Sequence, residues 1–461
     1  MAGPETRRPV RWKQALLAVL ALLLAIGALL YRQAEQIVLG AEAYAYGYPL
    51  VIMDLTRQAA ALSTGPENHL RRVRRFPDAD FKAVVRPNVD TLYTTAFIDM
   101  ARGPWVFEMA ANDQRYEVMP IMDAWTNVFA APGSRSGGNA GGRFLLVGPG
   151  WQGSVPEGLR LLRAPTRMVW LIGRTQTNGV ADYPLVHRLQ DGLTLRSLAD
   201  WQAGIQPAEP AWQPAAPPPL PPLQQMQDMA AVDFFNRLAA LMVHNPPAAA
   251  DGPMLAKLAR IGLRPGQAPD WGLLDRASIG LGRWIADVTV ARELKQPRDL
   301  VQGWSMPPAM LGAYGTHYNV RAVVAMVGLG ANLPADAVYP SARVDAQGRA
   351  LNGSQRYRLH FKAGGLPPVK AFWSVTAYGA DDYLIANPLN RHALGDRDAL
   401  RLNADGSLDL YLQAEAPAAE WAANWLPVKA GAPFGVTARL YWPEAAALAG
   451  RWGMPGIDRL D

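Results

Sequence analysis

Apolar and polar positions along the chain predict two strand-rich regions on either side of a helical middle. The clearest strand-like runs, each bounded by Gly, Pro, Asn or Asp, cover residues 82–86, 91–99, 105–108, 115–123, 143–147, 168–172, 356–361, 369–378, 408–413 and 435–442. In the last run Val436, Ala438 and Leu440 alternate with other residues, as in a half-buried antiparallel strand. Short strands at this spacing are typical of a β-sandwich or a jelly roll. We therefore expect a mainly β protein with a helical middle (α+β) and two jelly-roll-like β-sandwich domains.

Helical spacing of apolar residues predicts four further segments, at residues 33–62, 226–243, 271–294 and 306–329. Pro207–Pro222 holds eight prolines, which exclude regular helix and central strand, so we expect a linker or a stiff surface excursion there. The strand, turn, strand rhythm of residues 105–123 recurs in residues 357–377, which suggests a duplicated sandwich. The expected organisation is a basic tail over 1–14, an apolar segment over 15–31, a sandwich domain over 33–200, a Pro-rich linker and helical section over 201–330, and a second sandwich over 331–461.

The segment Ala15–Tyr31 is an unbroken, charge-free run of seventeen residues rich in Leu and Ala. That length is the short end of the roughly 17–25 residues that a membrane-spanning helix needs. Basic residues precede it, so the positive-inside rule predicts a cytoplasmic N-terminus and a body in the periplasm or outside the cell. A cleaved signal peptide is the alternative, because Ala25-Ile26-Gly27 looks like a small-residue cleavage site. The apolar run continues past that point, which favours an uncleaved anchor in the inner membrane, and both alternatives export the body.

Composition restricts the chemistry more than the location. A chain of 461 residues with 50% hydrophobic and 18% charged residues can form two or three domains. The absence of Cys excludes disulfides, thiolate metal sites and Cys nucleophiles. The formal net charge is +6, and the first fourteen residues supply +3 of it, since four basic residues there face one Glu. The basic cluster over residues 71–75 is typical of a solvated turn, so no nucleic-acid partner is expected.

No cofactor-binding or catalytic motif in this sequence has the context that its mechanism needs. Gly148–Gly153 has the literal G-x-G-x-x-G pattern of dinucleotide binding, but a turn over residues 154–158 follows where the mechanism needs a helix. The six His are isolated, and no Ser lies in a G-x-S-x-G motif. We therefore expect no metal and no cofactor, and the sequence identifies no catalytic residue.

Two polar segments nevertheless stand out. Arg86–Thr94 places short Asx side chains just before a strand, where such side chains cap the backbone or face a cleft. Asn387–Arg397 concentrates two Arg, an Asp, a His, two Asn, a Gly and a Pro between two strand-like runs, and Arg is a planar fork suited to carboxylate or carbonyl partners. We predict that the two segments form the halves of one cleft. The candidate ligand-binding residues are Asn88, Asp90, Tyr93, Asp123, Arg391, Asp396 and Arg397.

Several motifs resemble a pair of bacterial domains of unknown function. Tyr46-Gly-Tyr-Pro-Leu50 and Asn88–Tyr93 are similar to DUF1254. The similarity to DUF1214 rests on Leu366–Thr376, Asn387–Arg397, Asn424–Pro427 and Arg439–Pro443. The resemblance extends over residues 40–450 and implies two jelly-roll-like sandwiches joined by helices. It implies no activity, substrate, cofactor or catalytic residue.

Three hypotheses for function follow. The first is an exported, membrane-anchored protein that binds a small molecule, a saccharide or an envelope partner in a sandwich cleft, with some of its fifteen Trp as an aromatic platform. The alternative is an extracytoplasmic hydrolase or lyase that uses Asp, Arg and Tyr residues in an interdomain pocket, with carboxylates as acid and base and Arg facing an anionic transition state. In the third, Arg391 and Arg397 only tie loop carbonyls while Asp396 neutralises one of them. Whether the two segments meet, and whether aromatic side chains line an open groove, distinguishes these hypotheses.

Overall fold

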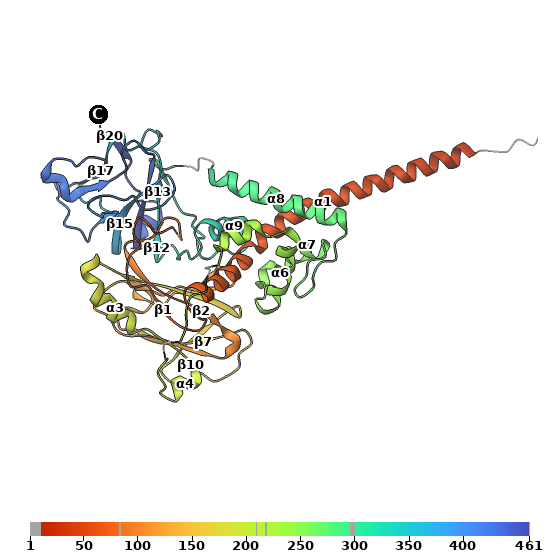
Figure 1. Cartoon of the computed structure of the whole chain (residues 1–461), viewed down its shortest axis with the longest axis horizontal. Coiled ribbons are helices and arrows are strands. Elements are labelled where there is room, and N and C mark those ends of the chain that lie inside the picture. Colours follow the sequence, from red (N-terminus) through yellow and green to blue (C-terminus); the bar gives the residue numbers. More distant parts are fainter. Residues whose placement is uncertain (1–10, 83, 209, 217–218, 296–299, 461) are drawn as a thin grey trace, which may run out of the picture.

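The structure is a computed structural model that describes residues 11–82, 84–208, 210–216, 219–295 and 300–460. Two β-rich domains lie one above the other, a layer of helices lies beside them, and one long helix projects from that layer (Figure 1). The mixture of helices and sheets with two β-rich regions agrees with the expected fold class.

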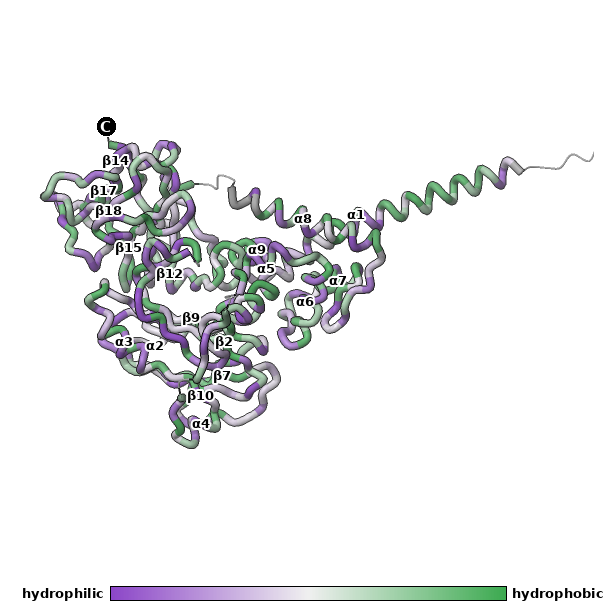
Figure 2. Tube along the Cα trace, in the orientation of Figure 1, coloured by the Kyte–Doolittle hydropathy of each residue, from purple (hydrophilic) through white to green (hydrophobic). Residues whose placement is uncertain are grey.

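The projecting helix, α1, spans Arg11–Ser63, so the predicted anchor and the helix predicted over residues 33–62 are one continuous helix. The part up to Tyr31 is exposed and apolar (Figure 2), and the helix is long and apolar enough to cross a membrane. From Leu39 to Leu55 most side chains are buried. They share one core with the helices α5 (Pro222–Asp228), α6 (Ala231–His244), α7 (Gly252–Arg260), α8 (Leu273–Lys295) and α9 (Tyr318–Val327).

Glycines allow these helices to pack backbone against backbone. A Cβ added to Gly282 of α8 would lie 2.2 Å from the carbonyl oxygen of Ile37 in α1. One added to Gly47 of α1 would lie 2.3 Å from the Leu238 side chain in α6. At Gly282 the close atom is backbone and cannot move aside, whereas at Gly47 it is the end of the Leu238 side chain, so the closest backbone approach of α1 is to α8.

The helical predictions are partly correct. The run over residues 271–294 is helix α8, whereas the run over 226–243 divides into α5 and α6. The prediction over residues 306–329 is wrong in its first half, because only Tyr318–Val327 is helical. Pro307, Pro308, Gly312 and Gly315 interrupt the first half, and Gly312 and Gly315 have positive φ.

The N-terminal domain consists of two sheets around one apolar core. Its six-stranded sheet has the order β1-β2-β9-β5-β6, with β4 also paired to β9. Its four-stranded sheet has the order β10-β3-β7-β8. The strands are β1 (Arg71–Arg72), β2 (Thr91–Asp99), β3 (Trp105–Met109), β4 (Glu117–Val118), β5 (Ile121–Asp123), β6 (Val128–Ala130), β7 (Gly142–Val147), β8 (Arg160–Arg163), β9 (Met168–Gln176) and β10 (Thr194–Ser197). The short helices α2 (Ser134–Gly137), α3 (Tyr183–Asp191) and α4 (Leu198–Gln202) accompany them.

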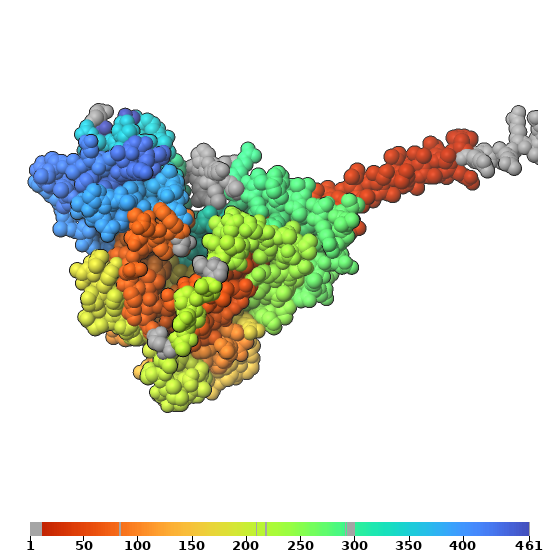
Figure 3. All heavy atoms as spheres, in the orientation of Figure 1, coloured from red at the N-terminus to blue at the C-terminus, as the bar shows by residue number. Residues whose placement is uncertain are grey.

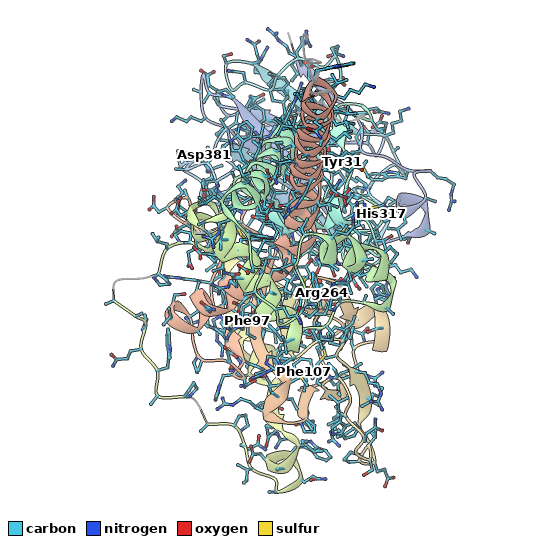
Figure 4. All side chains as sticks on the ribbon, turned by 90° about the vertical axis from the view of Figure 1, so that its right-hand side faces the viewer. Tyr31, Phe97, Phe107, Arg264, His317 and Asp381 are labelled. Atoms are coloured by element: carbon cyan, nitrogen blue, oxygen red, sulfur yellow. The ribbon has the colours of Figure 1, made fainter. Side chains whose placement is uncertain are left out.

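The outer face of the six-stranded sheet is covered by the helical layer. Phe97 on β2 belongs to the helical core, while Phe107 on β3 belongs to the core between the two sheets. Figure 4 shows Phe97 below α1 and Phe107 lower still, inside the sandwich. Both faces of the six-stranded sheet are therefore buried, one against the helices and the other against the four-stranded sheet.

The C-terminal domain is built in the same way around a second core. Its six-stranded sheet has the order β11-β13-β19-β15-β16, with β12 paired to β19, and its four-stranded sheet has the order β20-β14-β17-β18. The strands are β11 (Trp304–Ser305), β12 (Ala337–Val338), β13 (Ser341–Ala342), β14 (Arg356–Phe361), β15 (Val369–Gly379), β16 (Ala393–Gly395), β17 (Leu408–Gln413), β18 (Trp425–Pro427), β19 (Phe434–Pro443) and β20 (Ile457–Leu460). The short helix α10 (Ala445–Leu448) lies between β19 and β20 in the chain.

The two domains share one strand topology, which confirms the suggested duplication. The path β2-β9-β5-β6 corresponds strand for strand to β13-β19-β15-β16, and β10-β3-β7-β8 corresponds to β20-β14-β17-β18. In each four-stranded sheet one pair is parallel, β7 with β8 and β17 with β18, and these pairs occupy equivalent places. The repeated rhythm in the sequence is the passage from β3 to β5 and from β14 to β15.

Two strand predictions are wrong for one reason, contact between the domains. Residues 82 and 84–86 form no strand, and Arg86, with φ +49°, bonds through its backbone to Asp382 of the second domain. Strand β19 was expected to be half-buried, but both of its faces are covered. Its second face, with Thr437, Arg439 and Tyr441, lies against the first domain.

The described residues of the Pro-rich stretch before Pro222 form neither helix nor strand, as predicted. The segment crosses the surface in yellow-green in Figure 3 and is held to the end of α1. Trp212 Nε1 donates to the Ala61 carbonyl at 3.1 Å, and Ala215 N donates to the Leu62 carbonyl at 2.7 Å. It is therefore a surface strap rather than a free linker.

The close contact of α1 with α8 gives a testable expectation. Gly282→Ala should destabilise the protein by about 2 kcal/mol or more, because the new methyl group meets the Ile37 carbonyl. Gly280→Ala is the matched control on the same helix, since nothing lies within 4 Å of its added Cβ. Helix propensity predicts that this control stabilises the protein by up to about 1 kcal/mol. Denaturant unfolding of the full chain in detergent measures both, and equal effects would contradict the packing argument.

Candidate functional site

The two polar segments singled out in the sequence meet at the boundary between the sandwiches. Asp90, just before β2, forms an ion pair with Arg397, which follows β16. Arg397 Nη1 also donates to the carbonyls of Asp90 at 3.2 Å and Thr177 at 3.1 Å. Ser374 Oγ donates to the other carboxylate oxygen of Asp90 at 2.7 Å, and the Asp90 residue is only 1% exposed. Asn88, Asp90, Ser374 and Arg397 are called the interdomain clasp below.

Asn88 organises the first-domain side of the clasp. Its Oδ1 accepts the backbone N–H of Asp90 at 2.7 Å, which closes an Asx turn before the strand. Its Nδ2 donates to Thr91 Oγ1 at 2.8 Å, to the Tyr441 hydroxyl at 3.1 Å and to the Tyr93 hydroxyl at 3.3 Å. The Asx residue before the strand therefore fixes the backbone and also contacts the second domain.

A second set of interdomain contacts was missed by sequence reasoning. The buried Arg439 donates to Thr376 Oγ1 at 2.8 Å, to the Tyr378 hydroxyl at 2.6 Å and to the Arg86 carbonyl at 3.1 Å. Arg174 crosses in the opposite direction, to Asn332 Oδ1 at 2.8 Å and the Gly330 carbonyl at 2.7 Å. The alternation of Thr437, Arg439 and Tyr441 along β19 predicts a solvent-exposed face, so the sequence pattern gave no sign of this burial.

An apolar cluster surrounds these polar contacts. Tyr116 and Val118 of the first domain pack with Ala337, Phe372 and Tyr441 of the second. The Phe372 and Tyr441 rings are stacked with centroids 4.2 Å apart, and the Arg397 guanidinium lies 4.2 Å from the Phe372 ring centroid. The Asp90 carboxylate is therefore shielded from water, which strengthens its attraction to Arg397.

The other residues of the Asn387–Arg397 segment hold the segment itself. Arg391 Nη1 donates to the carbonyls of Ala422 at 2.7 Å and Trp425 at 3.0 Å, at the start of β18. Asp396 accepts the Trp373 N–H at 3.2 Å and lies 3.9 Å from Arg397 Nε. Burial raises the pKa of Asp396 to about 6, while the Trp373 N–H and Arg397 oppose the shift. These contacts are the ones that the architectural hypothesis requires.

Asp123 lies elsewhere, as the last residue of β5. Its Oδ1 accepts the N–H groups of Trp125 and Asn127, both at 2.9 Å. Burial raises its pKa to about 6, although these hydrogen bonds favour the charged form. The structure thus gathers Asn88, Asp90, Tyr93, Asp396 and Arg397, and leaves Arg391 and Asp123 apart from that group.

Beside Asp123 the helical layer contains a buried polar cluster that sequence spacing could not reveal. Arg321 on α9 is 2% exposed and lies within 5.2–5.5 Å of the Tyr46, Trp125 and Tyr318 ring centroids. Its Nε and Nη2 donate to no described residue. Asp251 accepts the hydroxyls of Tyr46 at 3.1 Å and Tyr318 at 2.9 Å. The members come from four distant parts of the chain.

An open groove of about 540 Å³ lies between the end of α1 and strands β1 and β2, beneath the strap. Its wall includes Phe97, Trp170 and Trp212, and the first two rings are stacked at 5.1 Å with an interplanar angle of 4°. Arg71 lies 5.8 Å from the Trp212 ring centroid and donates no hydrogen bond to a described residue. The seven candidate residues named from the sequence do not line this groove. Among described residues, no three His, Asp or Glu gather as metal ligands.

Comparison with known proteins agrees with the resemblance found in the sequence. Residues 67–197 match the family model described as "Protein of unknown function (DUF1254)", and residues 336–445 match "Protein of unknown function (DUF1214)". The crystal structure of the VPA0106 protein from Vibrio parahaemolyticus is similar, with a TM-score of 0.70 and 25% identity over 92% of this chain and 100% of that one. An uncharacterized protein from Burkholderia cenocepacia has a TM-score of 0.45 and 14% identity over 94% of each chain. No curated protein matches the sequence.

The interdomain clasp predicts a strong coupling between two residues far apart in sequence. Asp90→Ala should destabilise the protein by about 3–5 kcal/mol, because it leaves the Arg397 guanidinium buried without its carboxylate. The double variant Asp90→Ala/Arg397→Ala should lose clearly less than the sum of the single losses. Denaturant unfolding of all four proteins measures the coupling.

The exposed pair of Lys82 and Asp381, 3.7 Å apart, provides the control. Asp381→Ala should change stability by no more than about 0.5 kcal/mol. Additive losses for Asp90 and Arg397 would show that the clasp does not stabilise the boundary.

Asp123 predicts a particular dependence of stability on pH. Because burial raises its pKa to about 6, the folded protein binds this proton more tightly than the unfolded chain does. Its contribution to stability is therefore complete below about pH 4 and is lost as the pH rises through about 6. Asp123→Asn cannot ionise, so its stability relative to the wild type should rise by roughly 3 kcal/mol between pH 4 and pH 8. Unfolding at both pH values tests this, with Asp381→Asn as an exposed control, and a constant difference would refute the assignment.

Proposed function

The chain belongs to the family of proteins that join a DUF1254 domain to a DUF1214 domain, and we propose that it is a membrane-anchored binding protein for an acidic saccharide. The family descriptions assign no activity, so the proposal rests on this chain's own geometry. It has two parts, an anchor formed by α1 and a binding groove at the far end of the same helix. We also propose that both sandwiches are jelly rolls, and their shared strand order supports this.

The anchor is supported by the length, polarity and continuity of α1. Exposed aromatic residues, Trp12 and Tyr31, flank its apolar run. At 1.5 Å per residue they are about 29 Å apart, close to the thickness of a hydrocarbon core. Trp and Tyr favour the two interfaces of a bilayer, and the basic residues before the run favour a cytoplasmic N-terminus with the body in the periplasm or outside the cell. Cleavage at the Ala25-Ile26-Gly27 site would cut this continuous helix, so we propose an uncleaved anchor.

The groove carries the binding part of the proposal. Flat aromatic faces in an open groove are suited to stacking against the apolar faces of sugar rings. Trp170 is held in position by its Nε1–H, which donates to Thr95 Oγ1 at 2.8 Å. Trp212 is held by its bond to the Ala61 carbonyl. Two fixed indoles and Phe97 thus form a preorganised wall, which reduces the entropy lost on binding.

Charge favours an acidic ligand. Among described residues the groove wall contains four arginines and one carboxylate, Glu67. Arg57, Arg72 and Arg74 already bond to carboxylates or backbone carbonyls. The Arg71 side chain is exposed and, among the described residues, its guanidinium has only the Trp212 ring as a partner, so it can pair with a ligand carboxylate.

A hydrolase or lyase at the domain boundary is not favoured. That alternative needs Asp90 and Arg397 to face a substrate, but both already bond to protein groups, and Asp90 is buried. An acid or base must reach its substrate before its pKa matters.

The test titrates the full chain in detergent with trigalacturonic acid and follows intrinsic Trp fluorescence. We expect saturable quenching that the neutral trisaccharide maltotriose does not reproduce. Arg71→Gln should weaken binding by about tenfold or more, because a charge-assisted hydrogen bond is lost. Trp212→Ala should weaken it through lost stacking.

Arg102→Gln is the matched control, since Arg102 is an exposed arginine outside the groove. It should bind like the wild type. Equal affinity of Arg71→Gln and the wild type, or equal binding of maltotriose, would disprove the proposed ligand class.

A further inference from the structure

The edge of the body from which α1 projects presents an exposed apolar pair. Leu273 and Leu274, at the start of α8, are 86% and 60% exposed. In Figure 1 this end of α8 and α7 lie where α1 leaves the body. The described residues leave both leucines largely uncovered, and their place beside the proposed anchor indicates what covers them.

Contacts between α1 and α8 fix the height of this pair. Arg32, directly after the apolar run, forms a 2.9 Å ion pair with Asp275, the neighbour of Leu274. Ser278 Oγ donates to Gln33 Oε1 at 2.7 Å, and Gly282 faces Ile37. Later residues of α8 therefore contact later residues of α1, so the two helices run in the same direction. Leu274 therefore lies at the level where the apolar run of α1 ends.

Exposed basic side chains accompany the leucines. Arg264, in the loop between α7 and α8, and Arg276 are exposed, and Arg32 is partly exposed. Figure 4, which faces the end from which α1 projects, shows Arg264 below α1. The acidic residues there are Asp275, already paired, and the exposed Asp270. Leucines flanked by arginines suit the boundary between acyl chains and anionic headgroups.

We propose that Leu273 and Leu274 insert into the outer leaflet of the bilayer that α1 spans, so that the body rests on the membrane at this edge. The inference depends on the proposed anchor. It fixes the orientation of the body through two contacts, the helix and the leucine pair. The groove begins at Thr56, 25 residues beyond Tyr31, and is thus held about 40 Å from the membrane.

The proposed membrane contact does not extend along the whole exposed face of α8. Leu281, Trp284 and Val288 are also exposed on this helix. Trp284 lies ten residues beyond Leu274, or about 15 Å further along the axis of α8, so even with α8 inclined to α1 (Figure 1) it lies beyond the depth of a headgroup layer. The proposed contact therefore includes the first turn of α8 and excludes Trp284.

The absence of Cys allows a direct test on the full chain. Three single variants, Leu24→Cys, Leu274→Cys and Trp284→Cys, carry a nitrobenzoxadiazole label in phosphatidylcholine–phosphatidylglycerol vesicles. Two phospholipid quenchers are used in separate vesicles, one spin-labelled near its headgroup and one deep in its acyl chain. We expect the acyl-chain label to quench position 24, the headgroup label to quench position 274 at least roughly twofold, and neither label to quench position 284 strongly.

The position 24 label separates the two proposals. Quenching at 24 without quenching at 274 would leave the anchor intact and overturn the membrane contact of the body. Equal quenching at 274 and 284 would also overturn it, because the body would then lie flat on the bilayer. An unquenched label at 24 would overturn the anchor and the contact together.

Discussion

A carboxylate and a guanidinium that leave water together hold the two sandwiches in one arrangement. Removing either charge from water is costly, and the cost is offset only when both partners are present and fully hydrogen-bonded. Asp90 meets that condition through Arg397 and Ser374, and Arg397 also reaches two carbonyls of the first domain. The rings around the pair exclude water and strengthen it. Because either charge alone would be left buried, the domains cannot shift at this boundary without a large penalty.

The two domains share one strand order but pack against different partners. Both six-stranded sheets have the same strand path, but different partners cover their outer faces. Helices cover the sheet of the first domain, and the first domain covers the sheet of the second domain. Strand β19 consequently has two buried faces, and its Arg and Tyr residues contact the partner domain instead of solvent. One architecture thus supplies both a support for the helical layer and half of a polar interface.

Helix α1 connects features that would otherwise be unrelated. Its first part is exposed and apolar, its middle is buried among α5–α9, and its end forms one wall of the groove. A continuous helix transmits position along its whole length, so its exposed apolar part, the helical core and the groove keep fixed distances. Glycine contacts with α8 and α6 hold the helix in place against the body.

Local patterns in the sequence determined the elements, whereas contacts between distant segments decided the site. Strands such as Thr91–Asp99, Arg356–Phe361 and Leu408–Gln413 follow from short runs of strand-forming residues bounded by Gly, Pro, Asn or Asp, which is a local signal. The polar residues of the clasp were also visible, because Asx before a strand and clustered Arg are local signals. Their pairing was not, since Asp90 and Arg397 are 307 positions apart. Nor could spacing reveal that Trp212 of a Pro-rich strap would join Trp170 in a groove, or that Arg439 would be buried. Which polar residues face solvent, a ligand or another domain depends on how whole sheets and helices pack, and that is decided only in three dimensions.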